Sequence, residues 1–436
     1  MRIAMIGTGY VGLVSGACLS EFGHDVTCVD KVAEKIAALR RGEIPIFEPG
    51  LEHVVEANVR AGRLKFETEI GAAVQGADAV FIAVGTPSRR GDGHADLSYV
   101  YAAAREIAAA LDGYAVVVTK STVPVGTSRE VEKIIRGINP AAAFDMASNP
   151  EFLREGAAID DFRRPDRVVV GCDTDRARQV MREVYRPLYL NETPMLFTSR
   201  ESSELIKYAA NAFLATKITF INEMASLCEK VGADVQDVAR GIGLDGRIGN
   251  KFLHAGPGFG GSCFPKDTLA LLQTAQEAGA PSRLVEAVVA VNDARKFAMA
   301  EKIEQAFSGV AGKTIAVLGL TFKPNTDDMR DAPSLVIVPW LQKAGATICA
   351  FDPQGGREAH KLLNIELCDD AYHALDGADG VVILTEWNEF RALDVGRMKS
   401  LLKRPLMVDL RNIYNPAQMA AAGFTYVSVG RATTGS

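Results

Sequence analysis

The stretch that decides the fold is RIAMIGTGYVG, from Arg2 to Gly12, in which a short apolar run leads directly into three closely spaced glycines. The run has the length and composition of a buried strand, and the following LVSGACLSEFG predicts a helix that ends at Gly23. HDVTCVD then predicts a second strand that closes on Asp30. A Gly-x-Gly-x-x-Gly pattern is weak evidence alone, but here strand, glycine turn, helix and terminal acid follow in the order that a dinucleotide-binding fold requires.

The same residues indicate which dinucleotide would bind. Gly7, Gly9 and Gly12 would allow a tight turn and let a pyrophosphate approach the N-terminus of the following helix. Asp30 would accept hydrogen bonds from the ribose hydroxyls and would repel a 2′-phosphate. We therefore predict NAD rather than NADP as the cofactor, although the charge of Lys31 weakens this argument, and a chance run of glycines is the alternative.

Length and composition limit the remaining possibilities. A chain of 436 residues is too long for one hydrophobic core, so two or three domains are expected. A net charge of -6 argues against nucleic acid as the main partner, because phosphate binding needs a basic surface. Seven cysteines without a Cys-x-x-Cys pair predict neither a disulfide framework nor a metal site. With no signal peptide and no apolar run of membrane-spanning length, the sequence predicts a cytoplasmic protein.

Alternation of strands and helices continues after the first motif. GADAVFIAVGTP (76–87) predicts a strand, and YAVVVTKSTVPVGTS (114–128) predicts another with Thr122 at its carboxyl end. Because ligands bind beyond the carboxyl ends of the strands in doubly wound sheets, Thr122 is a candidate site residue. A threonine that only caps a turn is the alternative.

The segment ASNPEFLREGAA (147–158) predicts a helix with Asn149 as its N-cap and Pro150 at its first position. Glu151 and Glu155 would then share one face, one turn apart. Two neighbouring carboxylates repel each other unless a cation or a proton lies between them, which favours a functional role. Carboxylates are also common at helix starts because of the helix dipole, and this is the alternative.

A different pattern begins near Arg200. The segment ESSELIKYAANAFLATKITFINEMASLCEKVG (201–232) keeps helical periodicity for about thirty residues, which suits a spine between domains or a dimer interface. Lys207 and Asn211 share a face of this helix among mostly apolar neighbours. Lys207 either lies in a pocket or extends its ammonium to solvent, and the helix alone favours the second.

The C-terminal part repeats the first. KTIAVLGLTF (313–322) again predicts a strand and a glycine turn, and GATICAFDPQ (345–354) predicts a strand closing on Asp352. GADGVVILTEWNEF (377–390) closely resembles the earlier segment 76–87. We therefore predict an α/β protein with two Rossmann-like doubly wound domains, joined by a long central helix and a helical middle domain.

The two sheets are predicted to bind nucleotides in different ways. In the second, the glycine pattern is reduced to GLTFKP, so Lys323 and Arg330 would supply positive charge for a nucleotide. The predicted boundaries are 1–200 for the NAD-binding domain, 201–305 for the central helical domain, and 306–436 for a C-terminal domain that binds a sugar nucleotide. The final GRATTGS (430–436) carries no motif, and we expect it to fray.

The loop GPGFGGSCFPKDT (256–268) places one cysteine, Cys263, beside Lys266 and Asp267. In isolation the loop favours a surface turn with an incidental thiol. With two nucleotide-type domains, however, a nucleophilic thiol suggests oxidation beyond the aldehyde. An aldehyde can lose a hydride only after a nucleophile adds to its carbonyl, and a thiolate would give a thiohemiacetal and then a thioester. Lys266 or a helix N-terminus after the loop would favour the thiolate.

Several motifs together resemble one known family over essentially the whole chain. They are GTGYVGLVSG (7–16), FEPGL (47–51), STVPVGT (121–127), NPEFLREGAA (149–158), PDRVVVG (165–171), KYAANAFLATKI (207–218) with FINE (220–223), GPGFGGSCFPKD (256–267) and GLTFKPNTDDMRDAPS (319–334). With these motifs the sequence resembles the UDP-glucose 6-dehydrogenases, within the UDP-glucose/GDP-mannose dehydrogenase family. The resemblance implies four-electron oxidation of UDP-glucose to UDP-glucuronate, a polysaccharide precursor, with two NAD+ per turnover.

The resemblance also implies roles for individual residues. The catalytic set is Cys263 as nucleophile, Lys207 and Asn211 at the oxyanion, and Asp267, Thr122 and Glu155 for water and protons. The cofactor set is Gly7, Gly9, Tyr10, Val11, Gly12, Asp30, Lys35, Thr86, Thr122, Glu155, Lys266 and Arg330. The substrate set is Glu151, Phe152, Leu153, Arg154, Glu155, Lys207, Asn211, Arg247, Phe252, Leu253, His254, Ala255, Gly256, Gly260 and Lys323. Arg247 would be contributed by the partner in a homodimer.

Two alternatives to this function stay open. The first is a related dehydrogenase acting on GDP-mannose or a UDP-N-acetylhexosamine, with the same chemistry and a different sugar pocket. The second is a catalytically silent NAD-binding protein. The combined presence of Cys263, Lys207 and Asp267 argues against silence, because a silent protein has no need of all three.

Overall fold

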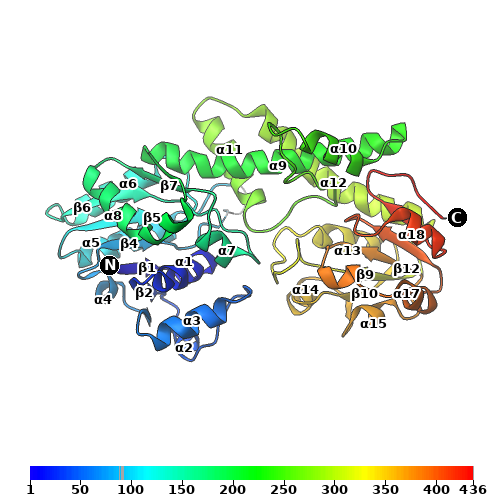
Figure 1. Cartoon of the computed structure of the whole chain (residues 1–436), viewed down its shortest axis with the longest axis horizontal. Helices are drawn as coiled ribbons and strands as arrows, with labels where there is room; N and C mark the ends of the chain where they lie inside the picture. Colours follow the sequence, from blue (N-terminus) through cyan, green and yellow to red (C-terminus); the bar gives the residue numbers. More distant parts are fainter. Residues whose placement is uncertain (88, 90–92, 436) are drawn as a thin grey trace. The chain divides into compact units, whose positions relative to one another are not determined.

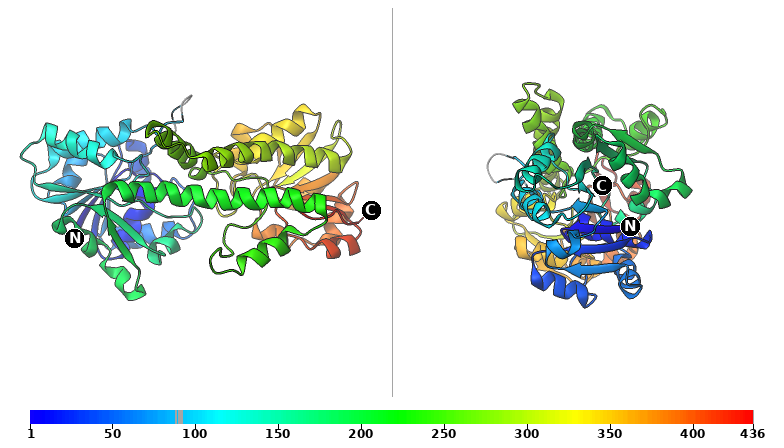
Figure 2. Two further views of the ribbon diagram at one scale, coloured as in Figure 1. Left: turned by 90° about the horizontal axis from the view of Figure 1, so that it is seen from above. Right: turned by 90° about the vertical axis from the view of Figure 1, so that its left-hand side faces the viewer.

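The computed structural model describes residues 1–87, 89 and 93–435, which form two compact units. The first comprises Met1–Ala210 and Gln273–Gly279, and the second comprises Asn211–Leu272 and Ala280–Ser436. Each contains one sheet with helices on both faces (Figure 1). The boundary falls inside α9 (Arg200–Val231), which Figure 2 shows as one uninterrupted helix. The prediction of two doubly wound sheets and a long helix is confirmed, whereas the three domain boundaries stay a prediction.

The first sheet has eight strands in the order β3-β2-β1-β4-β5-β6-β7-β8. Neighbouring strands are parallel except for β6 and β7. The strands are β1 (Arg2–Ile6), β2 (Asp25–Val29), β3 (Leu64–Glu67), β4 (Ala79–Ile82), β5 (Ala115–Thr119), β6 (Phe144–Ser148), β7 (Val168–Cys172) and β8 (Met195–Thr198). The order reverses direction between β1 and β4, and this is the point at which doubly wound sheets bind ligands.

Both faces of the first sheet are buried because side chains alternate along each strand. Ile3 and Met5 of β1 point to one face, and Ala4 and Ile6 point to the other. The first face is covered by α1 (Tyr10–Glu21), α2 (Ala33–Arg40), α3 (Leu51–Arg60), α7 (Ala158–Arg163), α8 (Asp175–Val184) and the 3-10 helix η1 (Arg186–Asn191). The second is covered by α4 (Ile70–Val74), α5 (Ser98–Ala110) and α6 (Thr127–Ile138).

The second sheet has six parallel strands in the order β11-β10-β9-β12-β13-β14, the same winding as the first six strands of the first sheet. Its strands are β9 (Thr314–Leu318), β10 (Thr347–Phe351), β11 (Glu366–Leu367), β12 (Gly380–Ile383), β13 (Leu406–Asp409) and β14 (Thr425–Ser428). The internal repeat in the sequence therefore corresponds to a repeated topology.

Helices from both ends of the second unit's sequence cover this sheet. One face packs against the end of α9, α10 (Val235–Gly243), α12 (Arg283–Phe307), α13 (Ser334–Lys343) and α14 (Gly356–Leu362). The other packs against α15 (Ala371–Leu375), α16 (Asn388–Arg391), α17 (Val395–Leu401) and α18 (Pro416–Ala421). The remaining helix, α11 (Phe264–Glu277), begins directly after Cys263.

The C-terminal segment does not fray as expected. Thr434 pairs with Tyr426 of β14 in an antiparallel bridge, with hydrogen bonds of 2.8 and 3.0 Å in the two directions. The buried Arg431 guanidinium donates to Ser428 Oγ and to the Tyr426 hydroxyl. The expectation was wrong because the segment satisfies backbone groups at the edge of the sheet, which a sequence motif does not reveal.

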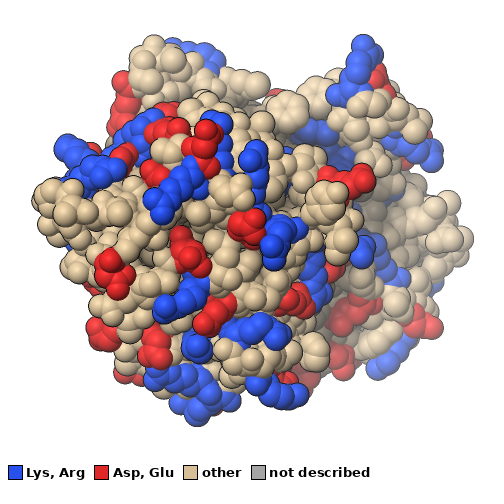
Figure 3. All heavy atoms as spheres, turned by 60° about the vertical axis from the view of Figure 1, so that its left-hand side comes forward, with Lys and Arg blue, Asp and Glu red and all other residues tan. Residues whose placement is uncertain are grey.

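The surface of the chain carries charges of both signs. In Figure 3, Lys and Arg side chains are interspersed with Asp and Glu over the face in view, which is typical of a solvated surface. Within the described residues, every helix is too short or too polar to cross a membrane.

Candidate active site

The glycine turn after β1 shows which of its glycines the chain itself requires. Gly7 has a φ of 105°, and a Cβ there would lie 2.6 Å from Ala83 O. A Cβ at Gly12 would lie 2.0 Å from Gly7 O. Gly9 differs, because its φ of -69° suits any residue and a Cβ there would meet no atom within 4 Å. Gly7 and Gly12 close the turn, and Gly9 leaves the N-terminus of α1 open to the approach of a ligand.

Asp30 lies directly after β2, where its carboxylate faces the same turn. Its Oδ2 accepts hydrogen bonds from Thr8 N (3.1 Å), Thr8 Oγ1 (2.8 Å) and Lys35 Nζ (3.0 Å), and its Oδ1 accepts one from Val32 N (3.1 Å). Burial would raise the pKa of Asp30, but the bonds from Lys35 and Thr8 outweigh it and lower the pKa below its usual value. A carboxylate with a lowered pKa at this point fits recognition of a ribose and rejection of a 2′-phosphate.

Two further residues of the predicted cofactor set make contacts at the ends of their strands. Thr86, after β4, donates its hydroxyl to Thr122 O at 2.9 Å and so joins the loops that follow β4 and β5. Tyr10, at the start of α1 beside Val11, donates its hydroxyl to the buried Glu48. Burial, followed by Glu48, raises the pKa of Tyr10, so its hydroxyl stays protonated.

Glu48 has a structural role beside this site that was not predicted from the sequence. Its two carboxylate oxygens accept hydrogen bonds from Gly156 N (2.6 Å) and Ala158 N (2.7 Å), in addition to the bond from Tyr10. It therefore fixes the loop that carries Glu151 and Glu155. A buried acid in the segment FEPGL was the available signal, but nothing in the sequence indicates which backbone amides it binds.

The helix predicted from Asn149 does not form. Residues 150–157 are irregular, and α7 begins only at Ala158. Asn149 is buried and donates from Nδ2 to Val169 O of β7 at 2.8 Å, so it is not an N-cap. The Glu151 carboxylate accepts a hydrogen bond from Leu153 N. The prediction was wrong because backbone amides of this segment bind carboxylates instead of helical carbonyls: Leu153 N binds Glu151, and Gly156 N binds Glu48, which is distant in sequence.

The partner of the Glu151 carboxylate is a lysine, Lys207. The Lys207 ammonium lies 3.3 Å from Glu151 Oε1, and both side chains are buried. Lys207 also lies 5.3 Å from the centre of the Phe152 ring, which Arg167 covers at 3.9 Å. Of the two alternatives for Lys207, the structure therefore supports the pocket. A buried, ion-paired ammonium is suited to stabilising a developing negative charge.

The remaining residues of this loop lie nearer the surface. The Arg154 guanidinium, which is exposed, forms an ion pair with Asp161 at 2.5 Å. Glu155 is partly buried, and its charge acts on Tyr10. Leu153 packs against the core of the first sheet. Of the loop's predicted substrate residues, Glu151 and Phe152 contact Lys207.

A buried lysine that the sequence analysis did not identify lies beside this loop. Lys120, directly after β5, donates to Asn149 Oδ1 and to the Tyr185 hydroxyl, both at 3.2 Å. Its ammonium also lies within 6 Å of the Phe162 and Tyr185 ring centres. Burial lowers the pKa of Lys120 to about 8. Lys120 thus holds Asn149, which directly precedes the Pro150–Glu151 segment.

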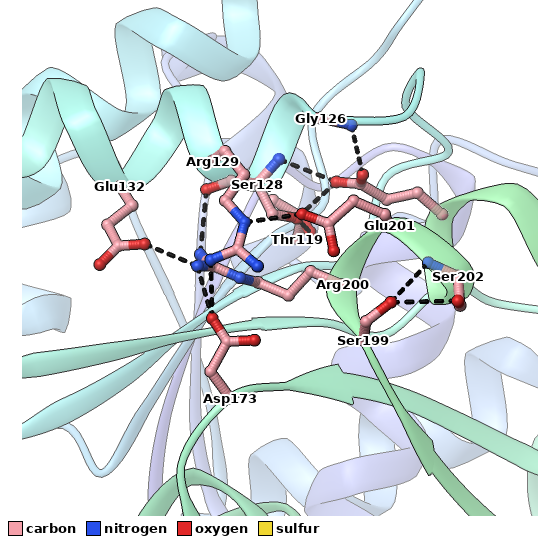
Figure 4. Close-up of polar contacts among 11 residues, drawn as sticks. Thr119, Gly126, Ser128, Arg129, Glu132, Asp173, Ser199, Arg200, Glu201 and Ser202 are labelled. Atoms are coloured by element: carbon pink, nitrogen blue, oxygen red, sulfur yellow. Dashed lines mark hydrogen bonds and ion pairs between the residues drawn. The ribbon is translucent and has the colours of Figure 1, made fainter.

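Charged side chains fix the first turns of α9 to the first sheet. Arg200 is buried and forms ion pairs with Glu132 (2.8 Å) and Asp173 (2.7 Å), as Figure 4 shows. The buried Glu204 carboxylate accepts hydrogen bonds from Gly126 N (2.6 Å), Ser128 N (2.8 Å) and Ser128 Oγ (2.6 Å) at the N-terminus of α6. The start of α9 is thereby tied to the loop that carries Thr122, one turn before Lys207.

The second unit holds the other candidate catalytic group. Cys263 stands at the N-cap position of α11, where its carbonyl accepts the first helical hydrogen bond, from Asp267 N at 2.8 Å. The Asp267 carboxylate is buried and accepts hydrogen bonds from Asn211 Nδ2 (2.6 Å) and Lys266 Nζ (2.5 Å). Asn211, Lys266 and Asp267 therefore form one charged and hydrogen-bonded cluster, one turn along α11 from the thiol.

The glycines before Cys263 are required by close packing. A Cβ at Gly260 would lie 2.3 Å from Asp331 O, and one at Gly261 would lie 2.6 Å from the Phe322 ring. Gly261 N donates to Arg330 O at 2.7 Å. The Arg330 side chain forms an ion pair with Asp328 at 2.8 Å. The glycine-rich loop therefore packs directly against the turn that follows β9.

The other predicted substrate residues of the second unit differ in exposure. Leu253 and Ala255 are buried, and His254 is exposed. The Phe252 ring lies 6.1 Å from the Phe264 ring. Lys323 Nζ lies 5.2 Å from the centre of the Phe322 ring.

Arg247, which is predicted to be contributed to a partner's site, lies on the surface. Its side chain is 89% exposed and forms an ion pair with Asp245 at 2.5 Å. Lys217 of α9 donates to Ile248 O and Gly249 O, which fixes this loop to the long helix.

Together these features define a class of protein: a two-sheet dehydrogenase with a dinucleotide-binding first sheet and a helix-start thiol in the second unit. The NAD binding domain of the UDP-glucose/GDP-mannose dehydrogenase family matches residues 1–189, its central domain matches 201–294, and its UDP binding domain matches 316–416. The chain belongs to the UDP-glucose/GDP-mannose dehydrogenase family. The predictions of this family and of an NAD-dependent enzyme are confirmed.

Individual relatives are similar over nearly the full length. A UDP-glucose 6-dehydrogenase of Rhizobium meliloti is 67% identical over 99% of this chain and 100% of its own. UDP-glucose 6-dehydrogenase TuaD of Bacillus subtilis is 50% identical over 99% of this chain and 93% of its own. The solved UDP-glucose dehydrogenase of Pyrobaculum islandicum is 37% identical with a TM-score of 0.91, covering 99% of this chain and 98% of its own.

Proposed function

We propose that this chain oxidises UDP-glucose to UDP-glucuronate, with two NAD+ reduced for each sugar. The observation that carries the proposal is the placement of Cys263 at the N-terminus of α11, with the Asn211–Asp267–Lys266 cluster one turn along. A helix N-terminus stabilises a thiolate. The glycines before Cys263 would let a ligand approach the backbone beside the thiol. The relatives named above, which carry this activity in their names, support the choice of substrate.

The first sheet fits the cofactor. Gly7, Gly9 and Gly12 would receive the pyrophosphate at the N-terminus of α1, and Asp30 would bind the ribose hydroxyls, with Lys35 holding its carboxylate. The bound NAD+ would accept the hydrides removed from carbon 6 of the glucose unit. The second unit would bind the nucleotide part of the substrate through Lys323 and the residues of FLHAG (252–256).

The proposed reaction consists of two oxidations at carbon 6 followed by hydrolysis of a thioester. The alcohol loses a hydride and a proton and becomes an aldehyde. The Cys263 thiolate then forms a C–S bond, and the thiohemiacetal loses a second hydride and a proton to give a thioester. Water cleaves the C–S bond, which gives the acid and returns the thiolate with release of protons. Lys207 and Asn211 would stabilise the oxyanions, and Asp267, with Thr122 and Glu155, would orient the water and accept protons.

We also propose a homodimer formed along α9. Phe213, Phe220 and Leu227, spaced seven residues apart, have exposed fractions of 64%, 46% and 52%. A row of this spacing lies on one face of a helix, and an apolar row of this kind is typical of helix pairing. Arg247, fixed to α9 through its loop, would reach the partner's site. On this proposal residues 1–200 bind NAD, 201–305 form the interface and 306–436 bind the UDP part.

The deciding experiment compares nucleotide sugars while NADH absorbance is followed. UDP-glucose should be oxidised with two NADH per sugar and without release of aldehyde, and GDP-mannose and UDP-N-acetylhexosamines should react far more slowly. A ratio of one with free aldehyde would refute the thioester route, and preference for another sugar would refute the substrate. No NADH with any of the sugars would leave the silent alternative.

The role of the thiol is tested by substitution. Cys263→Ala should lower acid formation by orders of magnitude while NAD+ binding is retained, because the second hydride then has no thiohemiacetal carbon to leave. Cys349→Ala is the matched control, since Cys349 is the other partly exposed cysteine. Burial, followed by Glu366, raises the pKa of Cys349 to about 12, so iodoacetamide should modify Cys263 first. Wild-type turnover in Cys263→Ala would end the proposed mechanism.

A further inference from the structure

We propose that Asn292, on α12, is a positioning residue that sets the Cys263 thiol for reaction by holding the backbone of Phe259. The inference rests on the proposed function of Cys263 as the nucleophile. All the residues concerned belong to the second unit. None of the motifs in the sequence singles out Asn292, which is 33 residues from Phe259 along the chain.

The contact consists of two hydrogen bonds between one side-chain amide and one residue's backbone. Phe259 N donates to Asn292 Oδ1 at 2.8 Å, and Asn292 Nδ2 donates to Phe259 O at 3.1 Å. Asn292 is 5% exposed, so both bonds lie away from water. A buried amide that satisfies a donor and an acceptor of the same residue fixes the position of that residue in both translation and rotation.

The glycine before Phe259 makes room for this contact. Gly258 has a φ of 110°, and a Cβ there would lie 3.0 Å from Asn292 Oδ1 and 3.5 Å from Lys296 Cγ. A side chain at this position would crowd Asn292 Oδ1 and would strain a backbone of positive φ. The glycine-rich composition of this part of the loop therefore serves the approach of Asn292 to the backbone.

The side chain of Phe259 packs against the residue that directly follows the thiol. Its buried ring packs edge-on against the Phe264 ring, with centroids 5.9 Å apart and an interplanar angle of 84°. Phe264 is the first residue of α11 and directly follows Cys263. Ala215 of α9 and Val288 of α12 complete the small core around these rings. Asn292 thus acts on Cys263 through Phe259 and Phe264.

Two neighbouring side chains hold the start of the same loop. Asn222 Oδ1 accepts a hydrogen bond from Gly256 N at 2.8 Å, and Arg295 Nε donates to Gly256 O at 3.1 Å. Both side chains are buried. Because these contacts remain when Asn292 is replaced, substitution of Asn292 should loosen the part of the loop nearest the thiol and leave its start in place.

The test uses Asn292→Asp and Asn292→Ala in the full chain. The aspartate keeps the shape and the acceptor of the bond from Phe259 N, but it presents an oxygen to Phe259 O in place of the donor. We expect kcat with UDP-glucose to fall roughly 10- to 100-fold in both variants, because small displacements of a reacting group have effects of this size. The KM for NAD+ should change less than about twofold, since the cofactor motif is not altered.

A matched control separates positioning from stability. Asn58, on α3, is an equally buried amide that donates to Val54 O and accepts from Arg63, and it takes no part in the proposed site. Asn58→Ala should lower the melting temperature about as much as Asn292→Ala and leave kcat within about twofold of wild type. Equal losses of kcat in the two variants would show that Asn292 contributes to stability alone, which would overturn the inference.

A second readout does not depend on the substrate. The rate of iodoacetamide modification of Cys263 should fall several-fold in the Asn292 variants, because the thiol loses its alignment with the N-terminus of α11. An unchanged or faster rate would refute positioning, whatever the turnover shows. If wild type does not oxidise UDP-glucose, the proposed function fails, and the alkylation rate still decides the role of Asn292. Should the Asn292 variants not fold, Phe259→Leu tests the next contact by removing the ring and keeping an apolar side chain.

Discussion

In the first sheet, β1 leads into Gly7 and a helix begins three residues later, at Tyr10; in the second, β9 leads into Gly319 and the next helix begins only at Ser334. Both glycines have positive φ, 105° and 87°, and a Cβ at either would collide with a residue just beyond the end of the neighbouring strand, Ala83 after β4 or Thr385 after β12. The tight turn is therefore common to both sheets. The helix N-terminus directly behind the turn is present only in the first, so only the first offers the usual site for a pyrophosphate.

The acids at the ends of the second strands differ in the same way. Oδ1 of Asp30 accepts one hydrogen bond among the described residues, from Val32 N. Both oxygens of Asp352 are occupied by several donors, which are Leu320 N, Thr321 N, Thr321 Oγ1, Gln354 N, Gly355 N and Trp387 Nε1. Asp352 therefore holds its turn together, whereas Asp30 keeps an oxygen that can accept a ligand. One sequence pattern therefore serves structure in the second sheet and, on the proposed function, recognition of the cofactor in the first.

The largest expected effect concerns stability of the second unit. Asp352→Asn should destabilise it by about 3 kcal/mol or more, because several buried donors lose their acceptor at once. Asp30→Asn should cost about 1 kcal/mol, since its carboxylate is less buried and has fewer partners. Both tryptophans, Trp340 and Trp387, lie in the second unit, so urea unfolding followed by tryptophan fluorescence reports that unit. Because the first unit has no tryptophan, Asp30→Asn is followed by circular dichroism, and a loss of unfolding free energy as large as that of Asp352→Asn would contradict the contrast between the two acids.

The glycines give the second expected effect. Gly9→Ala should leave the fold intact, because a Cβ there meets no atom within 4 Å, and should weaken NAD+ binding roughly tenfold or more by obstructing the pyrophosphate. In Gly319→Ala, the new Cβ would lie 2.4 Å from Thr385 Cβ. This variant should unfold at a lower urea concentration, as followed by tryptophan fluorescence, and should keep the NAD+ affinity of wild type. Calorimetric titration with NAD+ measures the affinity of both variants. Unaltered NAD+ affinity in Gly9→Ala would contradict the assignment of the first turn to the cofactor.

Periodicity and spacing were enough to predict both sheets, because each strand is a short apolar run bounded by turn residues and each first strand is followed by a glycine. The long helix was equally predictable from an unbroken repeat. The segment after Asn149 was mispredicted because Pro150 and the two acids match a helix start, whereas Glu48 and Lys207, distant in sequence, determine its conformation. Contacts of this kind leave no local pattern.

The candidate site shows the same limit. The types and spacing of Cys263, Lys266 and Asp267 indicated a reactive loop, and the structure adds that Asp267 binds Asn211. Lys120 and Asn292, by contrast, lie in segments with no unusual composition. Their importance depends on burial and on backbone partners that only the folded chain supplies. Sequence therefore predicted the groups proposed to react better than the groups that hold them.

Asp30 should also determine the choice between NAD+ and NADP+. Asp30→Asn should reduce the preference for NAD+ over NADP+ in kcat/KM by roughly tenfold, because the repulsion of a 2′-phosphate is removed. Asp25→Asn is a matched control at the other end of β2, where the carboxylate forms an exposed ion pair with Lys65 at 3.2 Å. Its preference should equal that of wild type. Comparable use of NAD+ and NADP+ by the wild-type chain would contradict the role given to Asp30.

The smallest expected effect concerns charges at the carboxyl ends of the fifth strands. Lys120 follows β5, and Asp409 ends β13, which holds the same place in the second sheet. Burial lowers the pKa of Lys120 to about 8 and raises the pKa of Asp409 above its usual value. Each group is therefore less readily ionised in the folded chain than in the unfolded one.

The two groups should tilt the pH dependence of stability in opposite directions. Between about pH 8 and the usual lysine pKa of about 10.4, the unfolded chain binds the additional proton at Lys120, so the free energy of unfolding should rise with pH. Between the usual aspartate pKa of about 3.9 and the raised pKa of Asp409, the folded chain binds the additional proton, so the free energy should fall as pH rises. Lys120→Met should flatten the alkaline slope, by at most about 1 kcal/mol per pH unit, and Asp409→Asn should flatten the acid one. Denaturation at a series of pH values measures the slopes, followed by circular dichroism for Lys120→Met and by tryptophan fluorescence for Asp409→Asn. Slopes equal to those of wild type would show that these groups ionise alike in the folded and unfolded chains.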